Sequence, residues 1–265
     1  MTHDQKRIYL IRQLLAEKPE YEKIPIPAQE KEQKDLLRGL MNVRMPKPVS
    51  QEFLEIQDEY LHRECELRGV FDSALLSPVP SDYRLILWQG DITTLKADAI
   101  VNAANSALLG CFHPLHSCID NIIHSRSGIQ LRLLCNEIMK KQGHEEPTGK
   151  AKITPAFNLP AKYILHTVGP IIYGDVTKRD CELLASCYRS CLELAVEKDC
   201  RSIAFCCIST GEFHFPNEKA AELAVETVKS FLDAGDYNIR VIFNVFKDMD
   251  REIYERILGV TDVEA

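Results

Sequence analysis

Three potential metal ligands lie within eight residues of one another, on the segment from Cys111 to Cys118. Cys111, His116 and Cys118 offer the sulfur and imidazole groups that zinc prefers. Their close spacing lets one loop wrap around a single ion. Three protein ligands leave a fourth position for water or substrate, as catalytic zinc sites do. The segment therefore predicts one zinc ion per chain, bound by these three residues.

Other uses of the same segment stay open. His113 is close enough to be the fourth ligand, which would close the site and make the ion structural. Without an ion, the two thiols would belong to a structural loop or form a redox pair. The N-terminus has no apolar run typical of a secretory signal, so the ten cysteines predict a reducing cytosol and a cytoplasmic protein. Most of them are expected to be core residues, among them Cys187, Cys191, Cys206 and Cys207.

Two further polar segments follow strand-like runs. Asn102 and Asn105 end one run, where side-chain amides can bind sugar hydroxyls, although Asn is also common in turns. The segment from Ser209 to Pro216 lies between a buried run and a helix. Gly211 lets the backbone approach a ligand, and the following helix directs its N-terminal dipole at it. This arrangement suits a diphosphate.

Composition excludes several classes of partner. The net charge is −7 and the sequence pI is about 5.7, whereas a nucleic-acid backbone needs clustered Lys and Arg. We therefore expect no nucleic-acid partner, and phosphate to be bound by backbone N–H groups. No stretch approaches 18 consecutive apolar residues, so we expect no membrane partner.

Hydrophobic periodicity predicts an α/β fold with a mainly parallel central sheet covered on both faces. The predicted helices are one that follows His116 and runs to about Lys141, one over about 180–198, one over 216–234, and one containing Ile253 and Ile257. The strand-like runs are 83–89, 98–102, 151–155, 163–168, 202–208 and 240–245. Ligands of such sheets bind beyond the carboxyl ends of the strands, where the unusual residues of this chain fall.

Residues 1–75 contain no Val-rich runs typical of strands. They are predicted to form a helical N-terminal extension of the domain at 76–265. Apolar residues mark three helical faces, and Pro25, Pro27, Pro46 and Pro48 separate them. Such an extension could brace the main domain, cover its site or bind a partner.

Four motifs together resemble the macrodomain family, over about residues 83–260. They are Gly90-Asp91-Ile92-Thr93, Asn102-Ala103-Ala104-Asn105, His166-Thr167-Val168-Gly169-Pro170 and Ser209-Thr210-Gly211. The segment from Gly110 to Asn121 and the helical extension are similar to the zinc-containing microbial branch, which is linked to sirtuin-type ADP-ribosyltransferases. The resemblance implies a three-layer α/β/α fold and a hydrolase that removes mono-ADP-ribose from protein, with a functional link to such a transferase.

The resemblance also implies residue roles. Asp91 would accept a hydrogen bond from the adenine amino group, and the backbone of Ile92 would help to hold the ring. Asn105 would contact the distal ribose and Phe215 would pack against it, with Asp120 near the scissile bond. The diphosphate would lie between the loop around Gly110 and the loop made by Ser209, Thr210, Gly211, Glu212 and Phe213.

This chain departs from the family where hydrolytic macrodomains carry a run of glycines, because Cys111, Phe112, His113 and Pro114 stand there. Zinc could replace the function of that glycine loop by polarising the distal ribose or by making a bound water more acidic. Asp120 could then orient or deprotonate that water. Asp120 could instead only hold the loop. The bond cleaved is expected to be an ester to an acidic side chain.

Two other functions remain as alternatives. Many macrodomains bind ADP-ribose without chemistry, so the chain could be a reader module. In a third hypothesis the zinc only fixes a loop and the helical extension recruits a partner.

Overall fold

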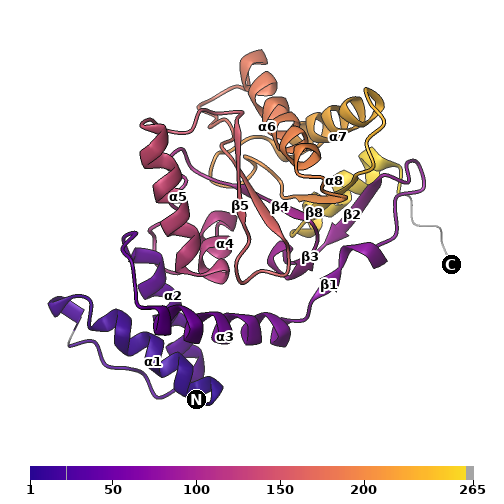
Figure 1. Cartoon of the computed structure of the whole chain (residues 1–265). Helices are drawn as coiled ribbons and strands as arrows, with labels where there is room; N and C mark the ends of the chain where they lie inside the picture. Colours follow the sequence, from indigo (N-terminus) through magenta and orange to yellow (C-terminus); the bar gives the residue numbers. More distant parts are fainter. Residues whose placement is uncertain (22, 261–265) are drawn as a thin grey trace.

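A six-stranded sheet forms the centre of the molecule in a computed structural model, which describes residues 1–21 and 23–260 (Figure 1). Its order is β2-β8-β7-β4-β6-β5, and every neighbouring pair is parallel except β5 with β6. The strands are β2 (Leu85–Gln89), β4 (Ala99–Ala103), β5 (Ala151–Pro155), β6 (Tyr163–Thr167), β7 (Ser202–Phe205) and β8 (Arg240–Val245). The predicted α/β fold with a mainly parallel sheet is confirmed.

Helices flank this sheet. Among them, α6 packs against β5 and β6, α4 against β4, and α8 against β2 and β8. The helices of this region are α4 (Ile119–Ser127), α5 (Ile129–Gln142), α6 (Lys178–Glu197), α7 (Asn217–Asp233) and α8 (Asp248–Leu258), with a short 3-10 helix at Ile92–Thr94. Their buried apolar faces and the sheet form one hydrophobic core. In the described residues no helix is both long and apolar enough to span a bilayer.

The predicted single helix from His116 to about Lys141 is wrong, because Gly128 divides it into α4 and α5. Gly128 has a φ of +98° and a ψ of 170°, a conformation that only glycine adopts readily. A Cβ at this position would lie within 3 Å of the side chains of Gln57, Gln130 and Asn158. The strand expected to extend to residue 208 ends at Phe205, which frees the next residues to form a loop.

Three helices make up the extension, as predicted: α1 (His3–Leu15), α2 (Glu30–Val43) and α3 (Gln51–Arg68). Thr2 and Ser50 cap α1 and α3 with their hydroxyl groups. A short 3-10 helix at Pro19–Tyr21 follows α1. After α3 comes a two-residue strand that the sequence did not predict, β1 (Phe71–Asp72), paired in parallel with β3 (Leu95–Lys96), and a 3-10 helix at Ser73–Leu75.

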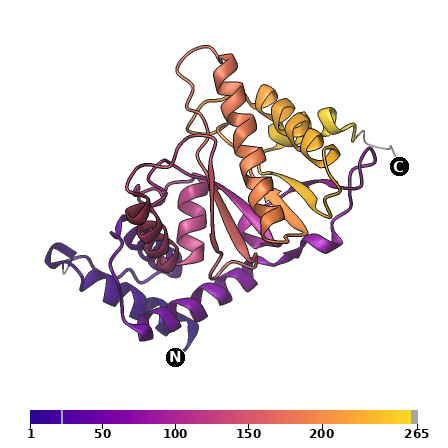
Figure 2. The same cartoon turned by 45° about the horizontal axis from the view of Figure 1, so that its top comes forward.

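The extension has its own hydrophobic cluster, built by α1, α2 and α3 and joined by Ile129 of α5. Its three helices lie together beside α4 and α5 in both views (Figure 1, Figure 2). The Gln57 side chain accepts a hydrogen bond from the Ile129 N–H at 3.0 Å, so a residue of α3 caps the first turn of α5. The division of the chain at residue 75 stays a prediction.

Gly128→Ala is expected to lower the free energy of unfolding by about 2 to 4 kcal/mol, because it combines an unfavourable backbone conformation with a steric clash. Gly143→Ala is the matched control, since Gly143 also has a positive φ of +79° but a Cβ there would meet no atom within 4 Å. Urea denaturation of both variants measures the difference. Equal losses would show that the crowding at Gly128 is unimportant.

Candidate active site

A cavity of about 580 Å³ opens at the carboxyl ends of β2, β4, β7 and β8, where the sequence predicted a ligand site. All but two of the predicted site residues line it: Asp91, Ile92, Asn105, Cys111, His116, Cys118, Asp120, Ser209, Thr210, Gly211, Glu212 and Phe213. Residues from four separate segments of the chain therefore meet around one space.

Gly110 and Phe215 are the two that do not line the cavity. The Gly110 carbonyl oxygen accepts a hydrogen bond from Asn105 Nδ2 at 3.1 Å, so it lies directly behind the wall. The φ of Gly110 is +78°, and a Cβ there would lie 2.8 Å from the His124 ring. Phe215 is buried in the hydrophobic core, and its packing against a ribose stays a prediction.

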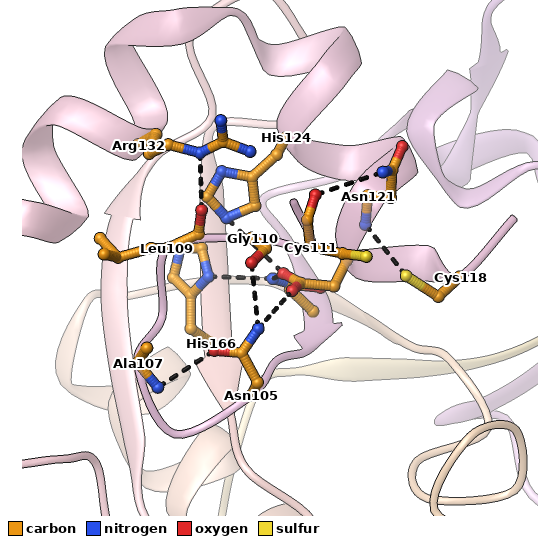
Figure 3. Close-up of polar contacts among 12 residues, drawn as sticks. Asn105, Ala107, Leu109, Gly110, Cys111, Cys118, Asn121, His124, Arg132 and His166 are labelled. Atoms are coloured by element: carbon orange, nitrogen blue, oxygen red, sulfur yellow. Dashed lines mark hydrogen bonds and ion pairs between the residues drawn. The ribbon is translucent and has the colours of Figure 1, made fainter. Parts of the chain in front are cut away.

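Asp120 lies on the first turn of α4 and is held by two amide side chains, one from β4 and one from the residues that follow it. Figure 3 labels the second of these, Asn105, whose amide also donates to the Gly110 carbonyl. Asn102 Nδ2 donates to one carboxylate oxygen at 2.8 Å, and Asn105 Nδ2 donates to the other at 3.2 Å. Asp120 is only 4% exposed, yet it borders the cavity. Burial raises the pKa of Asp120 to about 6, opposed by the hydrogen bond from Asn102 and by the charge of Arg132.

Two buried histidines lie behind this carboxylate. His124 Nε2 is 3.6 Å from Asp120 Oδ1, and neither ring nitrogen of His124 has a hydrogen-bond partner among the described residues. Burial lowers the pKa of His124 well below its usual value, so its ring is neutral. Asn102 Nδ2 donates to Nδ1 of His166 at 3.2 Å, which leaves the proton on Nε2, 2.9 Å from the Thr154 hydroxyl.

Cys111, His116 and Cys118 are brought together at the mouth of the cavity. One ligand atom from each lies within 4.8 Å of the other two, and Cys111 Sγ is 3.6 Å from His116 Nδ1. Tetrahedral zinc with bonds of about 2.0 to 2.3 Å places its ligand atoms roughly 3.5 Å apart, so this set fits zinc. Burial raises the pKa of the Cys118 thiol to about 12, with neighbouring Cys111 acting in the same direction.

A second cluster, of His124, Cys135 and His166, is also close enough to hold an ion. It fits one poorly, because both ring nitrogens of His166 are already in hydrogen bonds with Asn102 and Thr154. It is also completely enclosed in the core. Its role is to pack beneath Asp120.

The loop from Ser209 to Phe215 faces the metal ligands across the cavity. In the described part of the chain, the backbone N–H groups of residues 211–213 donate to no protein acceptor, so they are available to an anion at this wall. Helix α7 follows directly and adds its N-terminal dipole. Glu212 Oε1 lies 3.6 Å from His116 Nε2. This loop therefore contacts residues 109–118, the metal loop, which carries the three candidate metal ligands.

Asp91 borders the cavity, and neighbouring groups hold its carboxylate in place. Its carboxylate accepts hydrogen bonds from the Thr93 backbone and hydroxyl and forms an ion pair with Arg126 of α4. The charge of Arg126 and these hydrogen bonds keep the pKa of Asp91 low, although burial acts strongly in the opposite direction. Arg126 was not predicted from the sequence, because its partner Asp91 lies 35 residues away.

Phe246 and Lys247 also line the cavity and were missed. They directly follow β8, so the same strand-end rule that selected the other segments would have found them. Phe246 is 75% exposed, which leaves an aromatic face free at the rim.

A family model described as Macro domain matches residues 101–224. The chain is 55% identical to a protein-ADP-ribose hydrolase of Treponema medium, over 98% of this chain and all of that protein. It is 50% identical to a protein-ADP-ribose hydrolase of Staphylococcus aureus strain MRSA252, over 93% of this chain and 92% of that protein. The chain belongs to the macro domain family.

Solved macrodomains share the fold. A Trypanosoma brucei macrodomain in complex with ADP-ribose superposes with a TM-score of 0.66 at 30% identity, covering 84% of this chain and 95% of that one. A variant of the Oceanobacillus iheyensis macrodomain with ADPR gives 0.62 at 37% identity, covering 70% of this chain and 97% of that one.

His166 is expected to make this macrodomain sensitive to acid. Burial lowers its pKa from 6.5 to about 4, so between these values the unfolded chain binds a proton that the folded chain excludes. The free energy of unfolding is therefore expected to fall by about 3 kcal/mol from this residue as the pH falls through that window.

Chemical denaturation between pH 4 and 7 measures this slope. His166→Gln is expected to flatten it, whereas a Gln substitution of the exposed His144 is expected to leave it unchanged. If the slope of His166→Gln matches that of the wild type, other groups cause the acid sensitivity.

Proposed function

We propose that this protein is a zinc-dependent hydrolase that removes mono-ADP-ribose from acidic side chains of proteins. The observation that carries the proposal is the position of Asp120, held by Asn102 and Asn105 in the same cavity that Cys111, His116 and Cys118 border. A reader module has no need of a buried carboxylate at the ligand. Relatives 50% and 55% identical to this chain carry the name protein-ADP-ribose hydrolase, which supports the reaction class.

The remaining walls of the cavity suit the rest of ADP-ribose. Residues 211–213 line it, and their backbone N–H groups have no protein acceptor in the described structure, which supports a diphosphate site there. Asp91 offers carboxylate oxygens for the adenine amino group and Ile92 its backbone, while Asn105 offers its amide to the distal ribose. A volume of about 580 Å³ is in the range of cofactor-sized ligands.

Cys111, His116 and Cys118 would hold the zinc, and their spacing and chemistry fit it. When bound, zinc supplies a Lewis acid that polarises oxygen and makes bound water more acidic. With three protein ligands, the site keeps one position for substrate or water.

Asp120 acts on a proton in this proposal. Each carboxylate oxygen accepts one amide N–H, so each keeps lone pairs for an incoming water. Asp120 orients that water and takes up its proton as the ester is hydrolysed. The bond between C1 of the distal ribose and the side-chain oxygen breaks. The OH of the water ends on C1 of free ADP-ribose, and its other proton passes from Asp120 to the side-chain oxygen, which restores the carboxyl group.

A protein ADP-ribosyltransferase must supply the substrate of such a hydrolase. We propose a sirtuin-type enzyme for this role, and the resemblance of residues 110–121 and of the extension to the zinc-containing branch supports it. Ten cysteines without a disulfide in the described structure suit the reducing cytosol in which we place the protein.

Zinc removal is expected to stop turnover. The purified, zinc-stripped and zinc-restored proteins are compared for release of ADP-ribose from a protein mono-ADP-ribosylated on acidic side chains. Release should fall at least tenfold on stripping and return on restoration, because the metal would supply the polarising charge. Unchanged release from fully stripped protein would reduce the three ligands to loop scaffolding.

Asp120→Asn is expected to lower kcat about 100-fold or more while ADP-ribose still binds, because the carboxylate acts on the reacting water and not on the ground state. Asn105→Ala should also lower turnover, since it releases one Asp120 oxygen. Asp236→Asn, on an exposed residue without a side-chain partner in the described structure, is the control. Tight ADP-ribose binding with no release by the wild type would favour a reader.

A further inference from the structure

We infer that helix α2 of the N-terminal extension positions the metal loop, so that Arg38 and Asn42 set the affinity of Cys111, His116 and Cys118 for zinc. This inference rests on the proposed function of that site. It assigns to the extension a role in the active site, where the sequence left a brace, a cover and a partner surface as alternatives.

Arg38 contacts the metal loop directly. Its Nη2 donates to the backbone carbonyl of His116 at 2.6 Å and to Asn121 Oδ1 at 2.8 Å. Asn121 is fully buried and turns its Nδ2 to the carbonyl oxygens of Cys111 and His113, at 3.3 and 2.9 Å. One guanidinium group of α2 therefore reaches a metal ligand directly and two further loop residues through Asn121.

Asn42 makes the second contact, one helical turn further along α2. Its Oδ1 accepts the Leu115 N–H at 3.0 Å, and its Nδ2 donates to the Ser125 hydroxyl at 2.8 Å. Leu115 has a φ of +59°, which is uncommon for a residue other than glycine. Asn42 thus holds the strained residue that directly precedes His116.

Arg132 of α5 joins α2 to the beginning of the loop. Its Nη1 donates to the carbonyl oxygens of Met41, Asn42 and Arg44, at 3.0, 2.9 and 2.7 Å, and so caps the C-terminus of α2. Its Nε donates to the Leu109 carbonyl at 2.6 Å, and its guanidinium lies over the Phe112 ring. The position of α2 and that of the loop are therefore linked.

The loop contributes little to its own conformation. Within residues 109–118 of the described structure, one backbone–backbone hydrogen bond is internal, from the His116 N–H to the His113 carbonyl at 3.3 Å, and the His113 N–H also donates to Cys111 Sγ at 3.4 Å. Both bonds are long, so α2, Asn121 and Arg132 contribute most of the restraint on the conformation that brings the three ligands together. Partners that orient metal ligands typically change metal affinity about 10-fold to 100-fold when they are removed.

The test measures the affinity of the full-length protein for Zn²⁺ by competition with a chromogenic chelator, for Arg38→Met and Asn42→Ala. Both variants should bind Zn²⁺ about tenfold or more weakly than the wild type. Arg12→Met on α1 is the matched control, because Arg12 is exposed and makes no side-chain hydrogen bond or ion pair among the described residues. It should bind Zn²⁺ as the wild type does.

The absorption spectrum of the Co²⁺-loaded protein is the second readout. A displaced loop should change the d–d bands of the Arg38→Met variant, whereas a merely structural role would lower the melting temperature and leave both the spectrum and the Zn²⁺ affinity unchanged. If Arg38→Met does not fold, Arg38→Lys serves instead, since the shorter lysine side chain ends before the position of Nη2, the atom that donates to both acceptors.

Each outcome has one meaning. Normal Zn²⁺ affinity in both variants overturns the role of α2 and leaves the hydrolase proposal intact. A wild-type protein that binds no Zn²⁺ overturns the metal site itself, and this inference with it. Equal weakening by Arg12→Met would show that the loss is a general effect of altering the extension.

Discussion

The structure around the active site depends on one buried cation, Arg132. A guanidinium removed from water must find acceptors for its N–H groups, and Arg132 finds four backbone carbonyls: those of Met41, Asn42, Arg44 and Leu109. Burial lowers its pKa to about 10, which still leaves it charged at neutral pH. Because three of these carbonyls end α2 and the fourth begins the metal loop, satisfying this one charge fixes the extension against the site.

Asp120 imposes the complementary constraint. A carboxylate that is 4% exposed needs donors, and the two amides that end β4 supply them without introducing a second charge. Because Asn102 also contacts His166 on the neighbouring strand β6, the hydrogen-bonded chain extends from the sheet to the cavity. The proposed catalytic carboxylate is therefore placed by contacts to the central sheet, and the proposed metal ligands by a loop.

Local pattern predicted much of this arrangement. Strands β5 and β8 begin and end where their apolar runs do, and most of the site residues were found because they follow strands. The break at Gly128 was missed because apolar residues continue the helical period through it, at Ile123 and Leu131. The contacts of Arg38 and Asn42 could not be predicted, because periodicity tells which face of α2 is buried and not what it meets 73 to 83 residues later.

The bulky residues of the metal loop explain why contacts from other parts of the chain hold it in place. A loop of glycines can follow a ligand, but one containing Phe112, Pro114 and a positive φ at Leu115 has few conformations without strain. The strain at Leu115 costs on the order of 1 kcal/mol, and a hydrogen bond such as that from its N–H to Asn42 contributes about as much in the opposite direction. The free-energy cost of the strain at Leu115 and the contribution of its hydrogen bond to Asn42 therefore nearly cancel. An ion that binds to the proposed site would then lose little binding free energy to ordering the loop, because α2 and Arg132 have already ordered it.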